Sequence, residues 1–218
     1  RPAFQQSRAK GEVDVMRIGE DQVVRVLRCV CGKARHVGGG GDGDMGRDVV
    51  GEAVRRAVDP CHVKRAGRAG EVIGYARSQQ TRDTARRIGL CDRICDSAIE
   101  AVKDADLVVL AVPVGAMAEI AQEIGPHLKP GVTVTDVGSV KRAVIDAIAP
   151  HLPDNVHFVA GHPLAGTEHS GPESGFAELF DYRWTLLVPV ENSDEATVAR
   201  LREFWQGIGA YVEVMDAD

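Results

Sequence analysis

The sequence predicts an α/β fold in which a doubly wound sheet of parallel strands occupies residues 70–218. Three observations support it. Short apolar runs alternate with helix-length amphipathic stretches from residue 71 onward, as expected for βαβ units with right-handed crossovers. The run 106–112 is almost continuously apolar, which is typical of a strand buried on both faces. Polar and glycine-containing motifs follow directly after several of the predicted strands.

The elements are predicted from the period of their apolar residues. Strands are expected at 71–75, 106–112, 132–137, 156–160, 184–190 and 211–215. Helices are expected at 79–88, 115–128, 141–152 and 193–207. The second helix places Met117, Ile120, Ala121 and Ile124 on one stripe. The last helix is predicted to have Ser193 as its N-cap.

In doubly wound sheets, ligands bind beyond the carboxyl ends of the strands. Pro113, the pair Gly138 and Ser139, and His162 each follow a predicted strand. The sequence therefore predicts a ligand site at this edge of the sheet. This prediction depends only on the order of strands and motifs.

The stretch Gly161–Gly171, GHPLAGTEHSG, is the densest of these motifs. It holds two histidines, a carboxylate, a threonine and a serine between glycines, which let backbone approach a ligand closely. A histidine placed just beyond a strand end suits proton transfer near neutral pH. His162 is therefore the candidate acid or base.

This stretch, together with Thr135–Lys141 (TDVGSVK) and Val108–Val114 (VVLAVPV), resembles the motifs of the prephenate and arogenate dehydrogenase family of tyrosine biosynthesis. The resemblance covers residues 70–218. It implies a Rossmann-like domain and NAD(P)-dependent oxidative decarboxylation of prephenate, or arogenate, to 4-hydroxyphenylpyruvate, or tyrosine. It also implies a homodimer, formed through a C-terminal helical domain that this chain lacks.

The resemblance assigns roles around the substrate. His162 would accept the proton of the substrate hydroxyl, and Ser139 would hydrogen-bond the same hydroxyl. Ser139 could instead cap the helix that begins at Lys141. Glu168 and Thr167 would contact substrate at the mouth of the site, although Glu168 also fits a surface carboxylate. Lys141 itself has the position of a solvated residue in the first helical turn.

The resemblance also assigns the wall beside the nicotinamide to Val112, Pro113, Asp136 and Gly138. Pro113 could simply end its strand, and Asp136 could cap a turn instead of orienting the cofactor.

At the end of strand 71–75, enzymes that prefer NAD usually carry an acidic residue for the ribose hydroxyls. This chain has Arg77 and Ser78 there and no carboxylate. Both residues suit the 2′-phosphate of NADP, so the cofactor is NADP or NAD, with NADP favoured. Alternatively, Arg77 is only an exposed residue at a helix start.

Residues 1–69 form an atypical Gly- and Arg-rich segment whose few large apolar residues cannot build a core. A strand is possible at 23–30. The stretch 38–46, GGGGDGDMG, contains a formal G-x-G-x-x-G, but Asp44 would face the pyrophosphate. The segment is either a first dinucleotide-binding unit, a flexible linker, a divergent replacement, or a translation in the wrong frame.

Charge, apolar runs and cysteine content limit the classes of protein to which the chain can belong. Residues 1–70 hold 14 basic and 9 acidic residues, and the remainder holds 12 and 23, which argues against a nucleic-acid partner for the main body. No apolar run reaches membrane-spanning length, and no signal segment is recognised. Five cysteines fit neither a disulfide framework nor a metal site. A cytoplasmic enzyme with a small-molecule substrate is expected; the alternative is a non-catalytic fragment that keeps part of the cofactor-binding fold.

Overall fold

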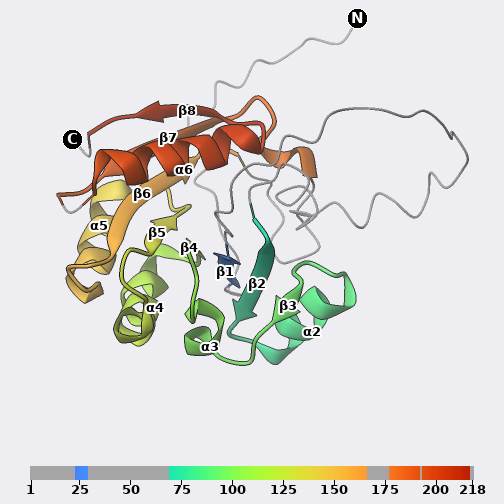
Figure 1. The fold of residues 1–218 in the computed structure, drawn as a ribbon. Coiled ribbons are helices and arrows are strands. Elements are labelled where there is room, and N and C mark those ends of the chain that lie inside the picture. The colour runs from blue at the N-terminus through green and yellow to red at the C-terminus, as the bar shows by residue number, and fades with distance from the viewer. Residues whose placement is uncertain (1–22, 29–68, 166–176, 192, 217–218) are drawn as a thin grey trace, which may run out of the picture.

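The computed structural model describes residues 23–28, 69–165, 177–191 and 193–216. Figure 1 shows one sheet with helices on both of its faces. The glycine-rich stretch 38–46 lies outside the described residues.

The sheet has eight strands in the order β3-β2-β1-β4-β5-β6-β7-β8. Their bounds are β1 Val23–Arg28, β2 Glu71–Ala76, β3 Arg93–Ile94, β4 Leu107–Ala111, β5 Thr133–Asp136, β6 His157–Pro163, β7 Trp184–Pro189 and β8 Tyr211–Val214. Strands β2 and β3, β4 to β6, and β7 and β8 pair in parallel within each group, whereas β6 and β7 pair antiparallel. The sheet is mostly parallel, and the predicted doubly wound α/β fold is therefore confirmed.

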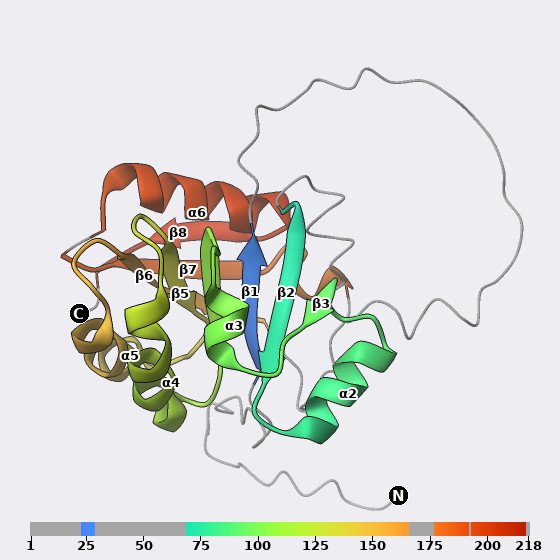
Figure 2. The same cartoon turned by 60° about the horizontal axis from the view of Figure 1, so that its bottom comes forward.

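Strand β1 departs from the parallel arrangement. It lies between β2 and β4 and pairs antiparallel with both, with Val23 opposite Ala76 and Arg28 opposite Glu71 (Figure 2). Strand β1 therefore ends at the edge where β2 begins. A dinucleotide-binding glycine loop is expected at the opposite edge, after a strand parallel to β2. Strand β1, which runs antiparallel to β2, is not such a strand.

The four predicted helices are shorter than the sequence predicts, and a fifth, α3, was not predicted. They are α2 Gln79–Arg87, α3 Ala98–Val102, α4 Met117–Ile124, α5 Lys141–Ile148 and α6 Glu195–Gly207. The predicted helices 115–128 and 141–152 change to 3-10 turns at Gly125–His127 and Ala149–His151. Pro126 and Pro150 lie in those turns. Because proline has no amide hydrogen and clashes with the preceding turn, the α-helical part ends before each of them.

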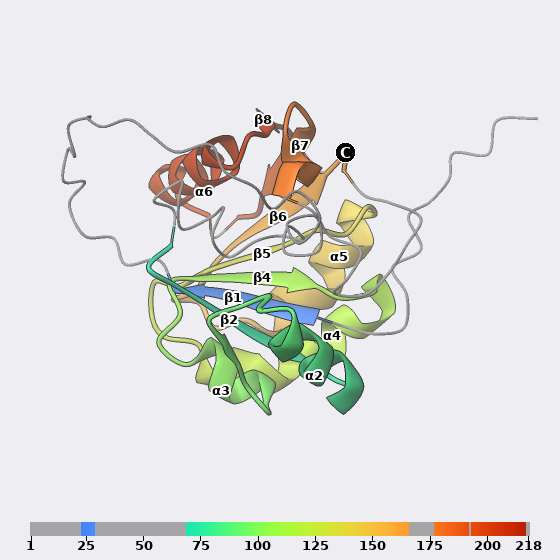
Figure 3. The ribbon, with the colours of Figure 1, turned by 90° about the vertical axis from the view of Figure 1, so that its right-hand side faces the viewer.

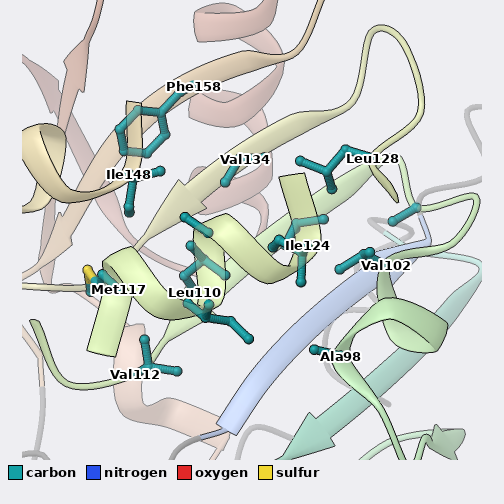
Figure 4. Close-up of a cluster of buried hydrophobic side chains, with 14 of the residues drawn as sticks. Ala98, Val102, Leu110, Val112, Met117, Ile124, Leu128, Val134, Ile148 and Phe158 are labelled. Carbon is teal, nitrogen blue, oxygen red and sulfur yellow. The ribbon is translucent and has the colours of Figure 1, made fainter. Parts of the chain in front are cut away.

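The two faces of the sheet form two apolar clusters. Successive residues of β4 alternate between them: Val108 and Leu110 pack under α3, α4 and α5, whereas Leu107 and Val109 pack under α6. Figure 3 shows α6 on one side of the sheet and α3 and α4 on the other. Figure 4 shows the larger cluster, in which side chains of α4 meet those of β4 and β5. The apolar stripe predicted for α4 is confirmed, because all four of its members are buried.

The prediction that Ser193 caps α6 is wrong. Asp194 is the N-cap, and its side chain accepts a hydrogen bond of 2.6 Å from the amide of Thr197. The hydroxyl of Ser193 instead accepts from the amide of Val190 at 3.1 Å and donates to the carbonyl of Phe158. Ser193 therefore ties the loop after β7 to strand β6.

Candidate functional site at the carboxyl edge of the sheet

The carboxyl ends of β4, β5 and β6 are adjacent, because these strands pair in parallel in that order. Pro113 follows β4, Gly138 and Ser139 follow β5, and His162 lies near the end of β6. The structure thus brings the three sequence motifs to one edge, as predicted. Val112 is buried there and Pro113 is partly exposed. Glu168 and Thr167 lie outside the described residues.

Asp136 ends β5, and its side chain is fully buried. Its carboxylate accepts hydrogen bonds from the amide of Gly138 at 2.7 Å and from the amide of Gly161 at 3.0 Å. The first bond closes the turn after β5, so the alternative in which Asp136 caps a turn is confirmed. The second bond joins β5 to β6.

Lys141 is the residue that the sequence interpretation missed. It was expected to be a solvated residue, but its side chain is only 10% exposed and its ammonium lies 2.5 Å from the carboxylate of Asp136. The same ammonium donates to the carbonyl of Gly161 at 2.5 Å. The available signal was an aspartate at a strand end followed five residues later by a lysine in the first turn of a helix. Asp136 and Lys141 therefore form a buried ion pair beneath the edge.

The ion pair and burial set the protonation of the neighbouring groups. Burial raises the pKa of Asp136 and lowers that of Lys141, and each partner opposes the shift of the other. Asp136 faces three N–H donors, an arrangement that suits an ionised carboxylate. Burial, and then the positive charge of Lys141, lower the pKa of His162. These two effects favour the neutral imidazole, which is the form that accepts a proton.

His162 lies within β6 and not beyond it, because the strand extends to Pro163. Its position opposite Leu186 of β7 fixes the backbone on which the imidazole stands. A histidine on a paired strand is held more rigidly than one on a loop, which suits a residue that must meet a reacting group.

Glycines permit the close packing of this edge. A β-carbon at Gly161 would lie 2.6 Å from the backbone oxygen of Asp136, and one at Gly138 would lie 3.1 Å from the side chains of Asp136, Met117 and Val144. The first distance is shorter than van der Waals contact with a fixed backbone atom allows. Gly161 is therefore required for β6 to approach the end of β5.

The alternative in which Ser139 caps the helix is wrong. Val140 occupies the N-cap position of α5 and makes no side-chain capping bond. Ser139 is exposed, so its hydroxyl lies at the surface of the edge that also carries His162. Its predicted contact with substrate stays a prediction.

The corner between β2 and α2 contains the two residues predicted to bind the ribose end of the cofactor. Arg77 is exposed, and Ser78 is the N-cap of α2. They lie at the carboxyl end of β2, which β1 separates from β4.

Two further observations concern the described part of the chain. No helix there is both long enough and apolar enough to cross a membrane, and no group of three or more His, Cys, Asp or Glu residues is arranged to hold a metal ion.

Cys95 is buried in the larger apolar cluster, and burial raises its pKa to about 11. Cys95 is thus a small apolar residue of the core.

The sequence of this chain is similar to those of known dehydrogenases. The chain is 41% identical over 144 residues to a cyclohexadienyl dehydrogenase of Zymomonas mobilis, covering 66% of this chain and 49% of that protein. It is 29% identical over 174 residues to the prephenate dehydrogenase of Bacillus subtilis, covering 79% and 46%. The chain thus spans about half the length of these relatives.

Solved structures of the same kinds of enzyme are also similar to this chain. The prephenate dehydrogenase of Aquifex aeolicus has a TM-score of 0.65 at 30% identity, covering 72% of this chain and 56% of that one. The arogenate dehydrogenase of Synechocystis also has a TM-score of 0.65, at 26% identity, covering 74% and 57%. Residues 61–214 match the family model described as the nucleotide-binding domain of prephenate dehydrogenase. The chain therefore belongs to the prephenate dehydrogenase family and contains its nucleotide-binding domain.

Proposed function

We propose that this chain is the nucleotide-binding part of an NAD(P)-dependent dehydrogenase that converts prephenate, or arogenate, to 4-hydroxyphenylpyruvate, or tyrosine. The observation that carries the proposal is the position of His162 beside the buried pair of Asp136 and Lys141 at the carboxyl edge. An Aquifex aeolicus relative has been solved with NAD+ and hydroxyphenyl propionate, which supports a nicotinamide cofactor and an aromatic-acid ligand.

The reaction requires a proton acceptor. When bound, the oxidised nicotinamide would supply the acceptor for the hydride that leaves the ring carbon bearing the hydroxyl. The hydroxyl proton passes to the imidazole of His162. As carbon dioxide leaves, the electron pair of the broken carbon–carbon bond enters the ring, which becomes aromatic, and the proton returns to the oxygen to give the phenol of the product. His162 suits this role because its lowered pKa keeps it neutral at physiological pH.

The other residues orient the reactants. Ser139 is exposed at the same edge and would donate its hydroxyl hydrogen bond to the substrate oxygen. Val112, Pro113 and Gly138 would form the wall beside the nicotinamide. Asp136 would position the backbone of this wall through its hydrogen bonds to two amides, because its carboxylate is buried. Glu168 and Thr167 remain proposed substrate contacts.

Formation of reduced nicotinamide by the purified chain tests the proposal. Prephenate and arogenate are each supplied with NAD and with NADP, and absorbance reports turnover. His162→Ala is expected to lower kcat by about 10²- to 10⁴-fold, the usual contribution of a general base. His127→Ala is the matched control, because His127 is exposed in the 3-10 turn after α4. Equal turnover by wild type and His162→Ala would refute the role of His162.

A second candidate function is cofactor binding without turnover, as a non-catalytic fragment. It is the alternative that the sequence left open, and the chain matches about half of the length of its relatives. Calorimetric titration with nucleotide separates the two candidates: binding without reduction in any substrate pair supports the second. Light scattering of the purified protein tests the homodimer that the family resemblance implies.

A further inference from the structure

Strand β6 runs past the end of its pairing with β5 before it reaches His162. The register pairs of these two strands stop at Phe158, opposite Val134, three residues before Gly161. On its other side, β6 is paired with β7 as far as Pro163. The backbone groups that β6 turns toward β5 beyond Phe158 are buried polar groups and need other partners.

Two side chains supply those partners at Gly161. The carboxylate of Asp136 accepts a hydrogen bond from the amide of Gly161 at 3.0 Å, and the ammonium of Lys141 donates to its carbonyl at 2.5 Å. That carbonyl belongs to the peptide bond that joins Gly161 to His162. Because a peptide bond is planar, holding the carbonyl fixes the plane from which the side chain of His162 projects.

The same ion pair also holds the segment that carries Ser139. The carboxylate of Asp136 accepts from the amide of Gly138, the residue before Ser139, at 2.7 Å. Lys141 begins the helix that follows Ser139. The pair is thus bonded to both segments that carry the predicted proton acceptor and the predicted hydroxyl donor, so it sets their relative position.

Stability alone does not account for this pair. Asp136 is fully buried and the side chain of Lys141 is 10% exposed, so the loss of hydration offsets much of the attraction between the two charges. Well-packed apolar residues of similar volume often replace such a pair without loss of stability. Apolar side chains could not bind the amide and the carbonyl of Gly161, however.

The charge of Lys141 also acts on the imidazole of His162. Burial, and then this positive charge, lower the pKa of His162. The residue opposite His162 on β7 is the apolar Leu186, and the charged Glu213 lies one strand further away, on β8, where it is exposed. A buried cation near the imidazole favours its neutral form, which accepts a proton.

From these contacts we infer that Lys141 is a positioning residue for His162: it holds the peptide bond before the histidine so that the imidazole meets the substrate hydroxyl in one orientation. The inference rests on the proposed function, because it places Lys141 in the site where His162 accepts the proton. Lys141 acts through the backbone of Gly161. Such a hold has kinetic value, since misplacing a reacting group by about 1 Å can lower a rate by about 10²-fold.

NMR spectroscopy of the imidazole of His162 in the full 218-residue chain tests this without turnover. Carbon relaxation reports the motion of the ring, a pH titration reports its pKa, and the spectrum of His162→Ala assigns its signals. Lys141→Met should make the ring more mobile and raise its pKa, because the hold on the carbonyl and the positive charge are both lost. Arg142→Met is the matched control, because it removes an exposed positive charge from the next position of the same helix and should change neither quantity.

A second variant, Asp136→Asn/Lys141→Met, removes both charges and leaves neither buried alone. It should change the motion and the pKa of the ring in the same directions, and it replaces the single variant if that protein does not fold. In the turnover assay, either variant is expected to lower kcat by about 10-fold or more at nearly unchanged KM. Failure of the double variant to fold would overturn the inference in favour of a purely structural role.

A ring whose motion and pKa stay the same in the variants would overturn the inference and leave the proposed function intact. Changes that Arg142→Met reproduces would overturn the assignment to Lys141. Turnover that His162→Ala leaves unchanged, or no turnover by the wild type, would instead count against the proposed function. The NMR measurement would still decide whether Lys141 orients His162.

Discussion

Removing the ammonium of Lys141 should cost more stability than removing any exposed lysine. Lys141→Met leaves the carboxylate of Asp136 buried without its cation. At 2.5 Å and an effective dielectric constant of about 20, the attraction between the two charges is about 7 kcal/mol before desolvation is subtracted. Breaking a buried pair typically costs about 3–5 kcal/mol. Because two backbone amides still bind Asp136, we expect about 3 kcal/mol.

Urea denaturation followed by circular dichroism measures this loss as a lower free energy of unfolding at unchanged m-value. Lys103→Met is the control, because Lys103 is exposed and should change stability by less than about 0.5 kcal/mol. The double variant Asp136→Asn/Lys141→Met should be more stable than the sum of the single losses predicts, since it removes both charges. A loss below about 1 kcal/mol for Lys141→Met would refute the buried ion pair.

Three further perturbations have defined outcomes. Gly161→Ala places a methyl group 2.6 Å from a backbone oxygen of β5 and should lower the free energy of unfolding by about 1–3 kcal/mol; Gly115→Ala, which meets nothing within 4 Å, should not lower it. An NMR titration should give His162 a pKa below its ordinary value of about 6.5. The unfolded chain then binds the proton more readily, so this contribution to stability is present above about pH 6.5 and is lost as the pH falls through the folded pKa; a measured pKa above 6.5 would contradict this. Asp194→Ala should lower the melting temperature through a loss of about 1 kcal/mol, whereas Asp194→Asn should retain the cap of α6; equal melting temperatures for the two variants would contradict the capping role.

The edge of the sheet could be predicted because it depends on local patterns. The apolar run of β4 and the strand before Gly138 were evident from composition, and parallel pairing then brings their ends together. The pairing of Lys141 was not predicted. Its side chain turns inward because Asp136 and the carbonyl of Gly161 converge on it, and Gly161 lies 20 residues further along the chain, on a separate strand.

Helix ends were predicted less well than helix positions. The apolar stripe of α4 and the position of α5 were recognisable, but both helices were predicted to continue past Pro126 and Pro150, where the hydrogen bonding changes. Helix α3, with five residues, and strand β3, with two, are too short to show a period. They are held by the sheet and by the larger apolar cluster.

Strand β1 has a consequence for how the domain can be assembled. It fills the middle of the sheet, yet residues 29–70 separate it from its neighbour β2. Without it, β2 and β4 would each present an unpaired row of backbone amides and carbonyls to the gap between them. By pairing with both neighbours along nearly its whole length, β1 makes one continuous sheet of two sets of strands that would otherwise be separate.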